Sequence, residues 1–422
     1  MNYWGLPKTI CYSTIYSSYK GCLMKIALMT YSTKPRGGVV HALNLAEALK
    51  LHGEDVKIFA LSKEKNASFY KKISVPYYIF KYSYKYCKYD TPEQKTVANV
   101  KRMIDKYVEK LPRDFDIYHT QDCVGAVALN RLKKEGLKAP TIRTIHHVDI
   151  FNEYRLQKFQ EESINTCDIK LVVSKYWKKY LQEKYSVYSD IIYNGIDSAR
   201  FENIDNTIIR NRFKFGNLPV ILFIGGLEPR KGLEYLILAM EQILKKYNNA
   251  ILIAVAHAGL IERNENDWFK MLIERLHIQN QVKLIDYVNE DEIPKYYAAA
   301  DVYVMPSRME GWGIGLMEAM ASQKPVVATK SGGITELVRN KKDGILIEPS
   351  NVNAIASAVC RLLESKKLRI KYGKCGKERI KKFTWEITAR KVLKIYRKVL
   401  ETAEKTNYKP TNLSIKCRSY DK

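Results

Sequence analysis

Residues 24–61 read MKIALMTYSTKPRGGVVHALNLAEALKLHGEDVKIFAL, and this stretch decides the fold. A compact apolar run at 25–30 predicts a strand, the proline and glycines at 35–38 interrupt it, and residues 39–52 have the apolar periodicity of a helix. Residues 56–61 predict the next strand. Strand, helix and strand in this order are typical of a right-handed βαβ unit in a parallel sheet.

The same alternation resumes at residue 116, continues along the chain and then starts a second time. After a polar stretch at 198–217, a strand at 220–224, the pair Gly225-Gly226 and a helix at 232–246 repeat the opening pattern. Short, continuously apolar strands between helices indicate parallel sheets buried on both faces. We therefore expect an α/β chain with two doubly wound, Rossmann-like parallel-sheet domains that face each other across a cleft, with the ligand at the carboxyl ends of the strands.

Composition limits the class of protein. The 422 residues suffice for about two domains, and 46% apolar residues exclude an intrinsically disordered chain. The chain has 71 Lys and Arg against 45 Asp and Glu, which gives a net charge of +26. This charge either favours anionic partners or reflects a lysine-rich composition without a function. Eight scattered cysteines form no CxxC or zinc pattern, and no apolar run reaches the roughly 18 residues of a membrane span. We therefore expect a cytoplasmic location and no metal site.

The strongest signal for a site is PSRMEGWGIGLMEAM, residues 306–320, which follows an expected strand and opens a helix. Its glycines let a ligand approach the backbone, and the helix N-terminus offers unpaired N–H groups to a diphosphate. Glu310 and Glu318 would repel a phosphate, so these carboxylates fit sugar hydroxyls better. The alternative is an ordinary glycine-rich loop with two solvated glutamates.

Other βα turns carry weaker signals of the same kind. GGLEPRKG, residues 225–232, places Arg230 and Lys231 together in a glycine-bounded loop that suits a diphosphate, although an exposed loop would look alike. Gly37 and Gly38 occupy the matching turn of the first domain. Three histidines also end strands at the expected cleft edge, where a structural role competes with a catalytic one: His119, His146 and His147.

Taken together, these residues resemble the retaining, nucleotide-sugar-dependent glycosyltransferases of the GT-B fold, family 4 (glycosyltransferase group 1). The most specific match is Glu310 followed by seven residues and Glu318, which is similar to the family's E-x7-E motif. The resemblance covers residues 24 to about 398, and its supporting matches occur in family order: GGVVH at 37–41, TIH at 144–146, VVS at 172–174, YNGID at 193–197, KG at 231–232, AAD at 299–301 and GGITE at 332–336.

The resemblance implies a division of labour along the chain. Residues 24–205 would be the acceptor domain and 206–380 the donor domain, with a C-terminal helix at 381–405 packing back on the acceptor domain. Residues 1–23 would be an extension and 406–422 a polar tail. The reaction implied is transfer of a hexose-type sugar from a nucleotide-diphosphate sugar to a glycan, a lipid-linked or a small-molecule acceptor, with retention and without a metal or other cofactor.

By the same resemblance, Glu310 contacts hydroxyls of the donor sugar and Glu318 the ribose. Lys231 neutralises the diphosphate as the glycosidic bond breaks, and His146 contacts the sugar from the acceptor side. The remaining donor-binding residues would be Gly37, Gly38, Arg230 and the backbone amides of Gly313, Ile314, Gly315 and Leu316. The family usually has Arg where this chain has Gly226, and we expect Arg230 to replace that cation.

Residues 70–89 are dense in Tyr and Lys, and the hypothesis that follows is peripheral contact with an anionic membrane. A solvated loop in a lysine-rich protein would look similar. Three other functions stay open: a nucleic-acid-binding protein; a GT-B epimerase, glucan synthase or phosphorylase; and an inactive relative. The sequence contains no recognised nucleic-acid-binding motif, which argues against the first. We expect no nucleic-acid partner.

Overall fold

The computed structural model of the chain describes residues 23–83, 90–257, 265–286 and 288–405. The extension expected at 1–23, apart from Leu23, and the polar tail expected at 406–422 lie outside the described residues. So do residues 84–89 of the segment rich in tyrosine and lysine.

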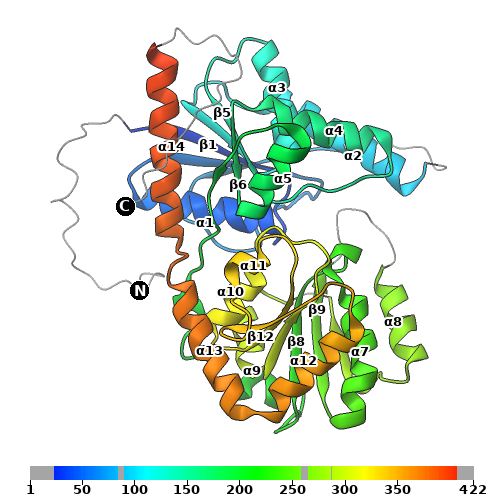
Figure 1. Cartoon of the computed structure of the whole chain (residues 1–422). Coiled ribbons are helices and arrows are strands. Elements are labelled where there is room, and N and C mark those ends of the chain that lie inside the picture. Colours follow the sequence, from blue (N-terminus) through cyan, green and yellow to red (C-terminus); the bar gives the residue numbers. More distant parts are fainter. Residues whose placement is uncertain (1–22, 84–89, 258–264, 287, 406–422) are drawn as a thin grey trace, which may run out of the picture.

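The described chain forms two parallel sheets, one above the other in Figure 1. The first sheet belongs to the N-terminal domain and has the order β3-β2-β1-β4-β5-β6-β7, in which every pair of neighbours is parallel. This is the doubly wound order predicted from the sequence. Its strands are β1 Lys25–Thr30, β2 Asp55–Ser62, β3 Tyr77–Lys81, β4 Ile117–Thr120, β5 Thr141–Ile145, β6 Ile169–Val172 and β7 Asp190–Ile191.

The second sheet repeats the topology in the C-terminal domain. Its order is β10-β9-β8-β11-β12-β13, again parallel throughout. The two parallel sheets agree with the expected GT-B architecture. The strands are β8 Val220–Gly226, β9 Ile251–His257, β10 Val282–Ile285, β11 Val302–Met305, β12 Val326–Thr329 and β13 Gly344–Ile347.

Helices cover both faces of each sheet, as a parallel sheet requires. In the N-terminal domain these are α1 Gly37–Leu51, α2 Pro92–Lys110, α3 Cys123–Lys134, α4 Tyr154–Thr166 and α5 Lys175–Tyr185. The segment between the sheets forms η2 Ser198–Phe201 and α6 Thr207–Arg212. The C-terminal helices are η3 Pro229–Lys231, α7 Leu233–Lys246, α8 Glu265–Arg275, α9 Ile293–Ala299, α10 Ile314–Ala321, α11 Ile334–Leu337, α12 Val352–Glu364, α13 Lys366–Ile380 and α14 Trp385–Lys405.

Two elements, β3 and α2, fall in a stretch for which the sequence pattern had predicted none. A signal for α2 was nevertheless present, because Thr91 and Gln94 form a capping box and Pro92 occupies the first helical turn. The buried apolar residues of this helix are also three or four positions apart, which is helical periodicity and a second signal in the sequence.

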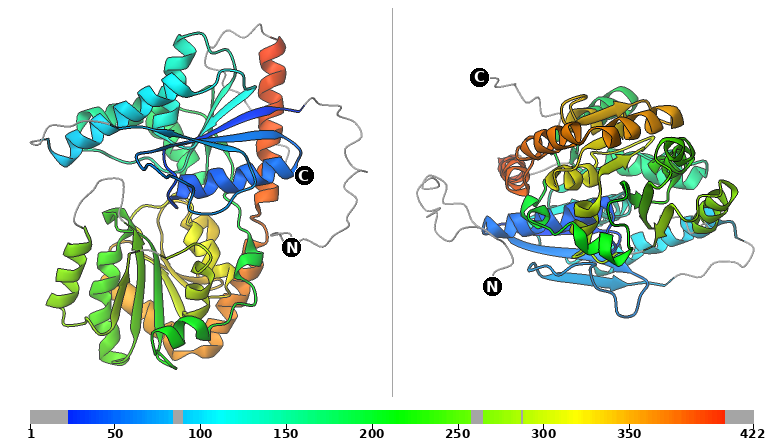
Figure 2. Two further views of the ribbon diagram at one scale, coloured as in Figure 1. Left: turned by 180° about the vertical axis from the view of Figure 1, so that it is seen from behind. Right: turned by 90° about the horizontal axis from the view of Figure 1, so that it is seen from below.

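The last helix, α14, leaves the C-terminal domain and runs along the N-terminal one (Figures 1 and 2). Tyr396 is fully buried there, and its hydroxyl lies 2.6 Å from His119 Nδ1. At the crossover Gly195 is packed so closely against the backbone of Trp385 that a Cβ would overlap it. The chain thus passes between the two domains twice, near Gly195 and again near Trp385, and these two segments are in contact.

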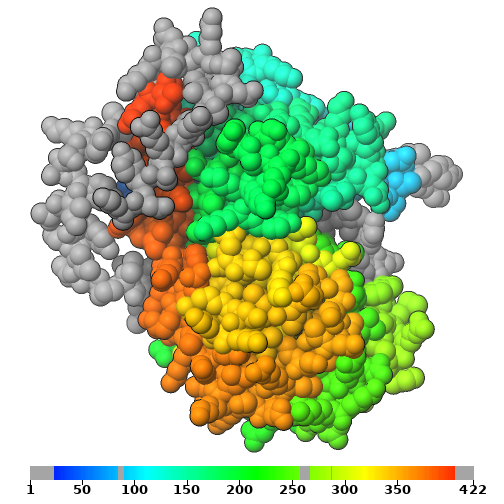
Figure 3. Space-filling view, in the orientation of Figure 1, coloured from blue at the N-terminus to red at the C-terminus, as the bar shows by residue number. Residues whose placement is uncertain are grey.

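The domains also share one apolar core. Side chains from β6 and α5, including the fully buried Trp177, join Trp312 and Ile334 of the C-terminal domain in a single cluster. Glu336 reinforces this contact by accepting hydrogen bonds from Tyr176 N at 3.0 Å and Tyr193 Oη at 3.2 Å. Figure 3 shows the two halves of the chain meeting along this seam.

Within the described residues, none of the helices is both long enough and apolar enough to cross a membrane.

Candidate active site

A cavity of about 260 Å³ lies between the two sheets, at the carboxyl ends of their strands. The N-terminal domain lines it with the start of α1 and the residues after β5. The C-terminal domain contributes the loops after β8 and β11 and the start of α10. Every site residue predicted from the sequence lines this cavity except Leu316 and His119.

An ion pair between residues 79 positions apart in sequence lies on the wall of the cavity. Lys231 Nζ lies 2.7 Å from Glu310 Oε2, and both side chains are largely buried. The same Glu310 oxygen accepts from Ser307 Oγ at 3.3 Å, and Oε1 accepts from Gly311 N at 3.2 Å. The carboxylate is therefore held in one orientation by donors of different elements.

This environment keeps Glu310 ionised. Burial by itself would raise the pKa of the carboxyl group, but the neighbouring Lys231 and Arg230 outweigh it and lower that pKa to about 2. A carboxylate with so low a pKa accepts hydrogen bonds from hydroxyl groups at neutral pH and is a poor base for removing a proton.

The loops that carry this pair are joined to each other. Arg308 N donates to Arg230 O at 2.7 Å, which ties the loop after β11 to the loop after β8. Gly232 ends the latter loop with φ of 69°, and a Cβ there would overlap Pro306 O. From the opposite domain, Trp177 Nε1 donates to Glu310 O at 3.2 Å. Both domains thus fix the position of Glu310.

The start of α10 presents its backbone to the cavity. Gly313 precedes the helix with φ of 96°, a conformation that favours glycine, and Ile314 and Gly315 follow on the cavity wall. The first amides of a helix have no intrahelical acceptor and can bind an anion. Leu316 differs from our expectation, because its amide donates to Gly313 O at 3.0 Å and its side chain is fully buried in the core.

Glu318 lies one turn further along α10 and is oriented by a residue that the sequence did not single out. Tyr297 Oη, on α9, donates to Glu318 Oε2 at 2.8 Å. Burial, and then the neighbouring carboxylate of Glu290, raise the pKa of Glu318 to about 7, against the opposing effect of Arg200. Glu290 is itself paired with Arg200 at 2.9 Å.

Gly37 and Gly38 begin α1 on the opposite wall of the cavity. A Cβ on Gly37 would meet no protein atom within 4 Å, and a Cβ on Gly38 would make only ordinary contacts. The packing of the protein therefore does not require glycine at either position. What the two glycines leave open is space in the cavity itself.

His146 reaches the cavity from the end of β5. Its Nε2 lies 3.1 Å from Gln121 Oε1, and its ring makes an edge contact with His41, with 4.9 Å between the ring centroids. Burial, and to a smaller extent His41, lower the pKa of His146 well below its ordinary value. His146 therefore offers a neutral imidazole to a ligand.

The structure separates the other strand-end histidines. His147 lines the cavity and pairs with Asp149 at 3.2 Å. His119 is fully buried between Tyr396 Oη and Thr144 Oγ1, at 2.6 and 2.7 Å. The expectation that His119 lies at the cleft edge is thus corrected: it holds α14 against the sheet.

Sequence reasoning missed Tyr297, Gln121, Trp177 and the Arg200–Glu290 pair. Gln121 directly follows the strand that ends at Thr120, so the rule that singled out His146 could have found it. The other three lie within helices or loops and carry no local signal. In the described part of the chain no three His, Cys, Asp or Glu side chains are grouped so that they could hold a metal ion.

Two doubly wound sheets with facing carboxyl edges, and between them a cation, a carboxylate and a glycine-opened helix, define a GT-B glycosyltransferase. Comparisons with known families agree. The model of glycosyltransferase family 4 matches residues 35–200, and that of glycosyl transferases group 1 matches residues 205–379. The chain belongs to this group 1/family 4 type of glycosyltransferase and is an enzyme.

Individual relatives support the same assignment. An uncharacterized glycosyltransferase of Methanocaldococcus jannaschii is 28% identical over 409 residues, which cover 90% of this chain and 99% of the relative. A GDP-mannose-dependent alpha-(1-6)-phosphatidylinositol monomannoside mannosyltransferase of Mycobacterium tuberculosis is also 28% identical, over 53% of this chain and 60% of its own.

Two solved structures share the fold over most of the chain. Sucrose-phosphate synthase of Thermosynechococcus elongatus superposes with a TM-score of 0.77 at 22% identity, covering 90% of this chain and all of its own. HepE of Anabaena, solved with UDP and glucose, gives 0.73 at 20% identity, covering 89% of this chain and all of its own.

Proposed function

We propose that this enzyme transfers a hexose-type sugar from a nucleotide-diphosphate sugar to a glycan, lipid-linked or small-molecule acceptor, with retention of configuration and without a metal ion. The observation that carries the proposal is the Lys231–Glu310 ion pair beside the start of α10. It puts a cation for a diphosphate, an ionised acceptor for sugar hydroxyls and free helix amides in one cavity. Retention rests on the resemblance to the family.

The diphosphate is the leaving group of this reaction, and its negative charge grows as the glycosidic bond breaks. Lys231, Arg230 and the first amides of α10 are fixed in the cavity before that charge develops, so they stabilise the transition state with little reorganisation. In other glycosyltransferases a divalent cation stabilises this charge. Glu310 orients the sugar, and the neutral imidazole of His146 contacts it from the other domain.

The identity of the donor follows only in part from the relatives. The mycobacterial relative is named as GDP-mannose-dependent, and HepE was also solved with UDP-glucose. We therefore place a purine or pyrimidine nucleoside diphosphate in the cavity and assign the acceptor to the N-terminal domain. A cytoplasmic site of action, with peripheral contact to an anionic membrane through exposed side chains such as Tyr77 and Tyr78, completes the proposal.

Thermal-shift measurements test the donor class directly. The wild type and Glu310→Ala are screened with UDP, GDP and ADP and with their common hexose conjugates, in EDTA. We expect one nucleotide hexose to raise the Tm of the wild type by several degrees. Glu310→Ala should keep the response to the free diphosphate and lose the further effect of the sugar.

Glu348→Ala is the matched control, since Glu348 lies in the same domain, is exposed and pairs with Lys330 across the surface. It should respond as the wild type does. If no nucleotide or nucleotide sugar stabilises the wild type, the proposed function is wrong, and the inactive-relative hypothesis takes its place.

The titration of Glu318 gives a separate prediction for nucleotide affinity. Its ionised form accepts hydrogen bonds from ribose hydroxyls, and the raised pKa of about 7 means that this form is lost as the pH falls through 7. Affinity for the nucleotide hexose, whose diphosphate does not titrate in this range, should therefore drop about tenfold from pH 8 to pH 6. Isothermal titration of Glu318→Gln over the same range should give weaker binding with a flat profile; a profile as steep as that of the wild type would contradict this role.

A further inference from the structure

One carboxylate on the cavity wall has no use in the function proposed so far. Glu228 lies in the loop after β8, and its side chain borders the cavity. Its Oε2 is buried and has no hydrogen-bond partner among the described residues. Its Oε1 faces Arg230 at 3.9 Å, which is too long for a hydrogen bond.

The absence of a side chain at Gly226 makes this position available. A Cβ on residue 226 would overlap the Glu228 carboxylate. The backbone of Glu228 is fixed at the same time, because its carbonyl accepts from Lys231 N at 2.8 Å. Gly226 and Glu228 therefore form one feature: the glycine leaves a space, and the carboxylate fills it beside the cavity.

The surroundings of Glu228 parallel those of Glu310. The loop after β8 supplies a neighbouring cation to each carboxylate, Arg230 to Glu228 and Lys231 to Glu310. The Glu310 oxygens accept hydrogen bonds from the protein, whereas Glu228 Oε2 accepts none among the described residues. A buried acceptor without a donor is costly, and the Glu228 side chain as a whole is 33% exposed, so a small rotation that turns this oxygen toward a ligand hydroxyl in the cavity would gain a hydrogen bond. A diphosphate carries only acceptors at neutral pH and cannot supply a donor.

We propose that Glu228 binds a hydroxyl group of the transferred sugar and so contributes to the choice of donor. This inference rests on the proposed function, because it presumes a nucleotide sugar in the cavity. The sugar is the part of such a donor that both carries hydroxyl groups and lies near the Lys231–Glu310 pair. We assign the ribose hydroxyls to Glu318, which lies on α10.

The test separates the sugar from the diphosphate. Dissociation constants of UDP, UDP-glucose, GDP and GDP-mannose are measured calorimetrically for the wild type, Glu228→Gln and Glu228→Ala. We compare the diphosphate and the hexose conjugate of the nucleotide that the wild type binds. Both variants should bind the nucleotide hexose about tenfold more weakly than the wild type does. They should leave the diphosphate unchanged or bind it more tightly, because a negative charge next to Arg230 is removed.

Glu234→Gln is the control for a general effect of losing a glutamate. Glu234 lies in the first turn of α7, close in sequence and outside the cavity wall, and its variant should bind both ligands as the wild type does. Equal affinities of the wild type and Glu228→Ala for the nucleotide hexose would overturn the inference, and so would an equal loss for both ligands, which would indicate a structural role. A wild type that binds none of the four, and none of the ADP conjugates of the thermal-shift screen, would instead refute the proposed function.

Discussion

Replacing Lys231 with methionine is expected to lower the rate of sugar transfer about a hundred- to a thousandfold. Methionine keeps an unbranched apolar chain of similar length and removes the charge that stabilises the departing diphosphate. It also removes the counter-ion of Glu310, at 2.7 Å in the wild type, and leaves a buried carboxylate without its main partner. The pKa of Glu310 should then rise, and its hold on the sugar should weaken. Turnover of the nucleotide sugar identified by thermal shift is the measurement.

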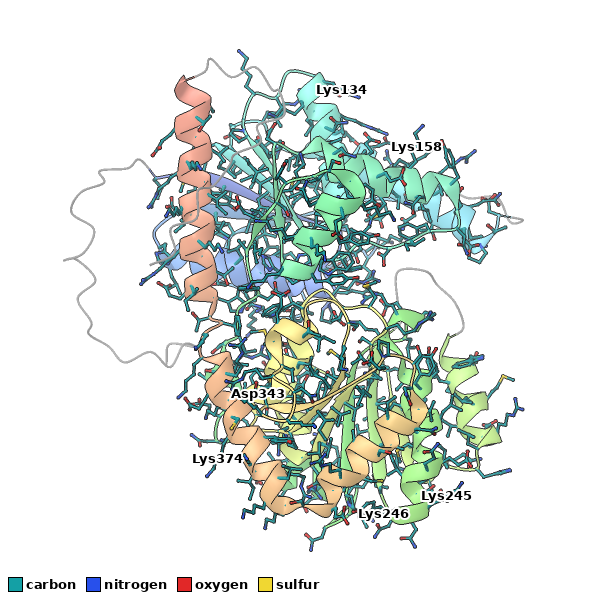
Figure 4. All side chains as sticks on the ribbon, viewed as in Figure 1. Lys134, Lys158, Lys245, Lys246, Asp343 and Lys374 are labelled. Carbon is teal, nitrogen blue, oxygen red and sulfur yellow. The ribbon has the colours of Figure 1, made fainter. Side chains whose placement is uncertain are left out.

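Lys245→Met controls for the substitution itself. Lys245 is on α7, is 73% exposed and forms a surface pair with Glu241 at 3.5 Å. Figure 4 shows it at the end of the C-terminal domain that points away from the N-terminal domain. Its variant should turn over the donor as the wild type does. Full activity in Lys231→Met would refute the role of Lys231 and with it the charge-stabilisation mechanism.

The second large effect is on stability. Trp177→Ala should lower the free energy of unfolding by about 3–5 kcal/mol, since it removes a large, fully buried side chain from the core that both domains share. The variant also loses the hydrogen bond from Trp177 Nε1 to Glu310 O. We therefore expect a lower Tm together with a weaker response to the nucleotide sugar. Thermal unfolding with and without the ligand measures both.

Two further tryptophan variants make this prediction specific. Trp177→Phe keeps most of the apolar contact and loses the indole N–H, so its Tm should lie between those of the wild type and Trp177→Ala. Trp268 is 51% exposed on α8, and Trp268→Ala should change the Tm little. If Trp177→Ala unfolds at the same temperature as Trp268→Ala, the seam between the domains does not stabilise the chain in the way described above.

The fold could be predicted from the sequence because the signals that define it are local. Short apolar runs separated by helical periodicity specify parallel βαβ units, and their repetition after residue 217 specifies a second domain. The site could be located for the same reason. Motifs that follow strands of a parallel sheet must gather at its carboxyl edge, and this brought Glu310, Lys231 and His146 to one cavity.

The tertiary structure alone decided which side chains meet. Lys231 pairs with Glu310 rather than standing free, Tyr297 orients Glu318, and His119 anchors a helix 277 residues away through Tyr396. Such contacts depend on how helices and loops pack across long separations, and no periodicity or spacing in the chain encodes them. The same holds for Gly226: the sequence showed only that a cation is missing there, whereas packing placed a carboxylate in its space. Local pattern thus determined the architecture and the place of the site, and long-range packing determined its charges.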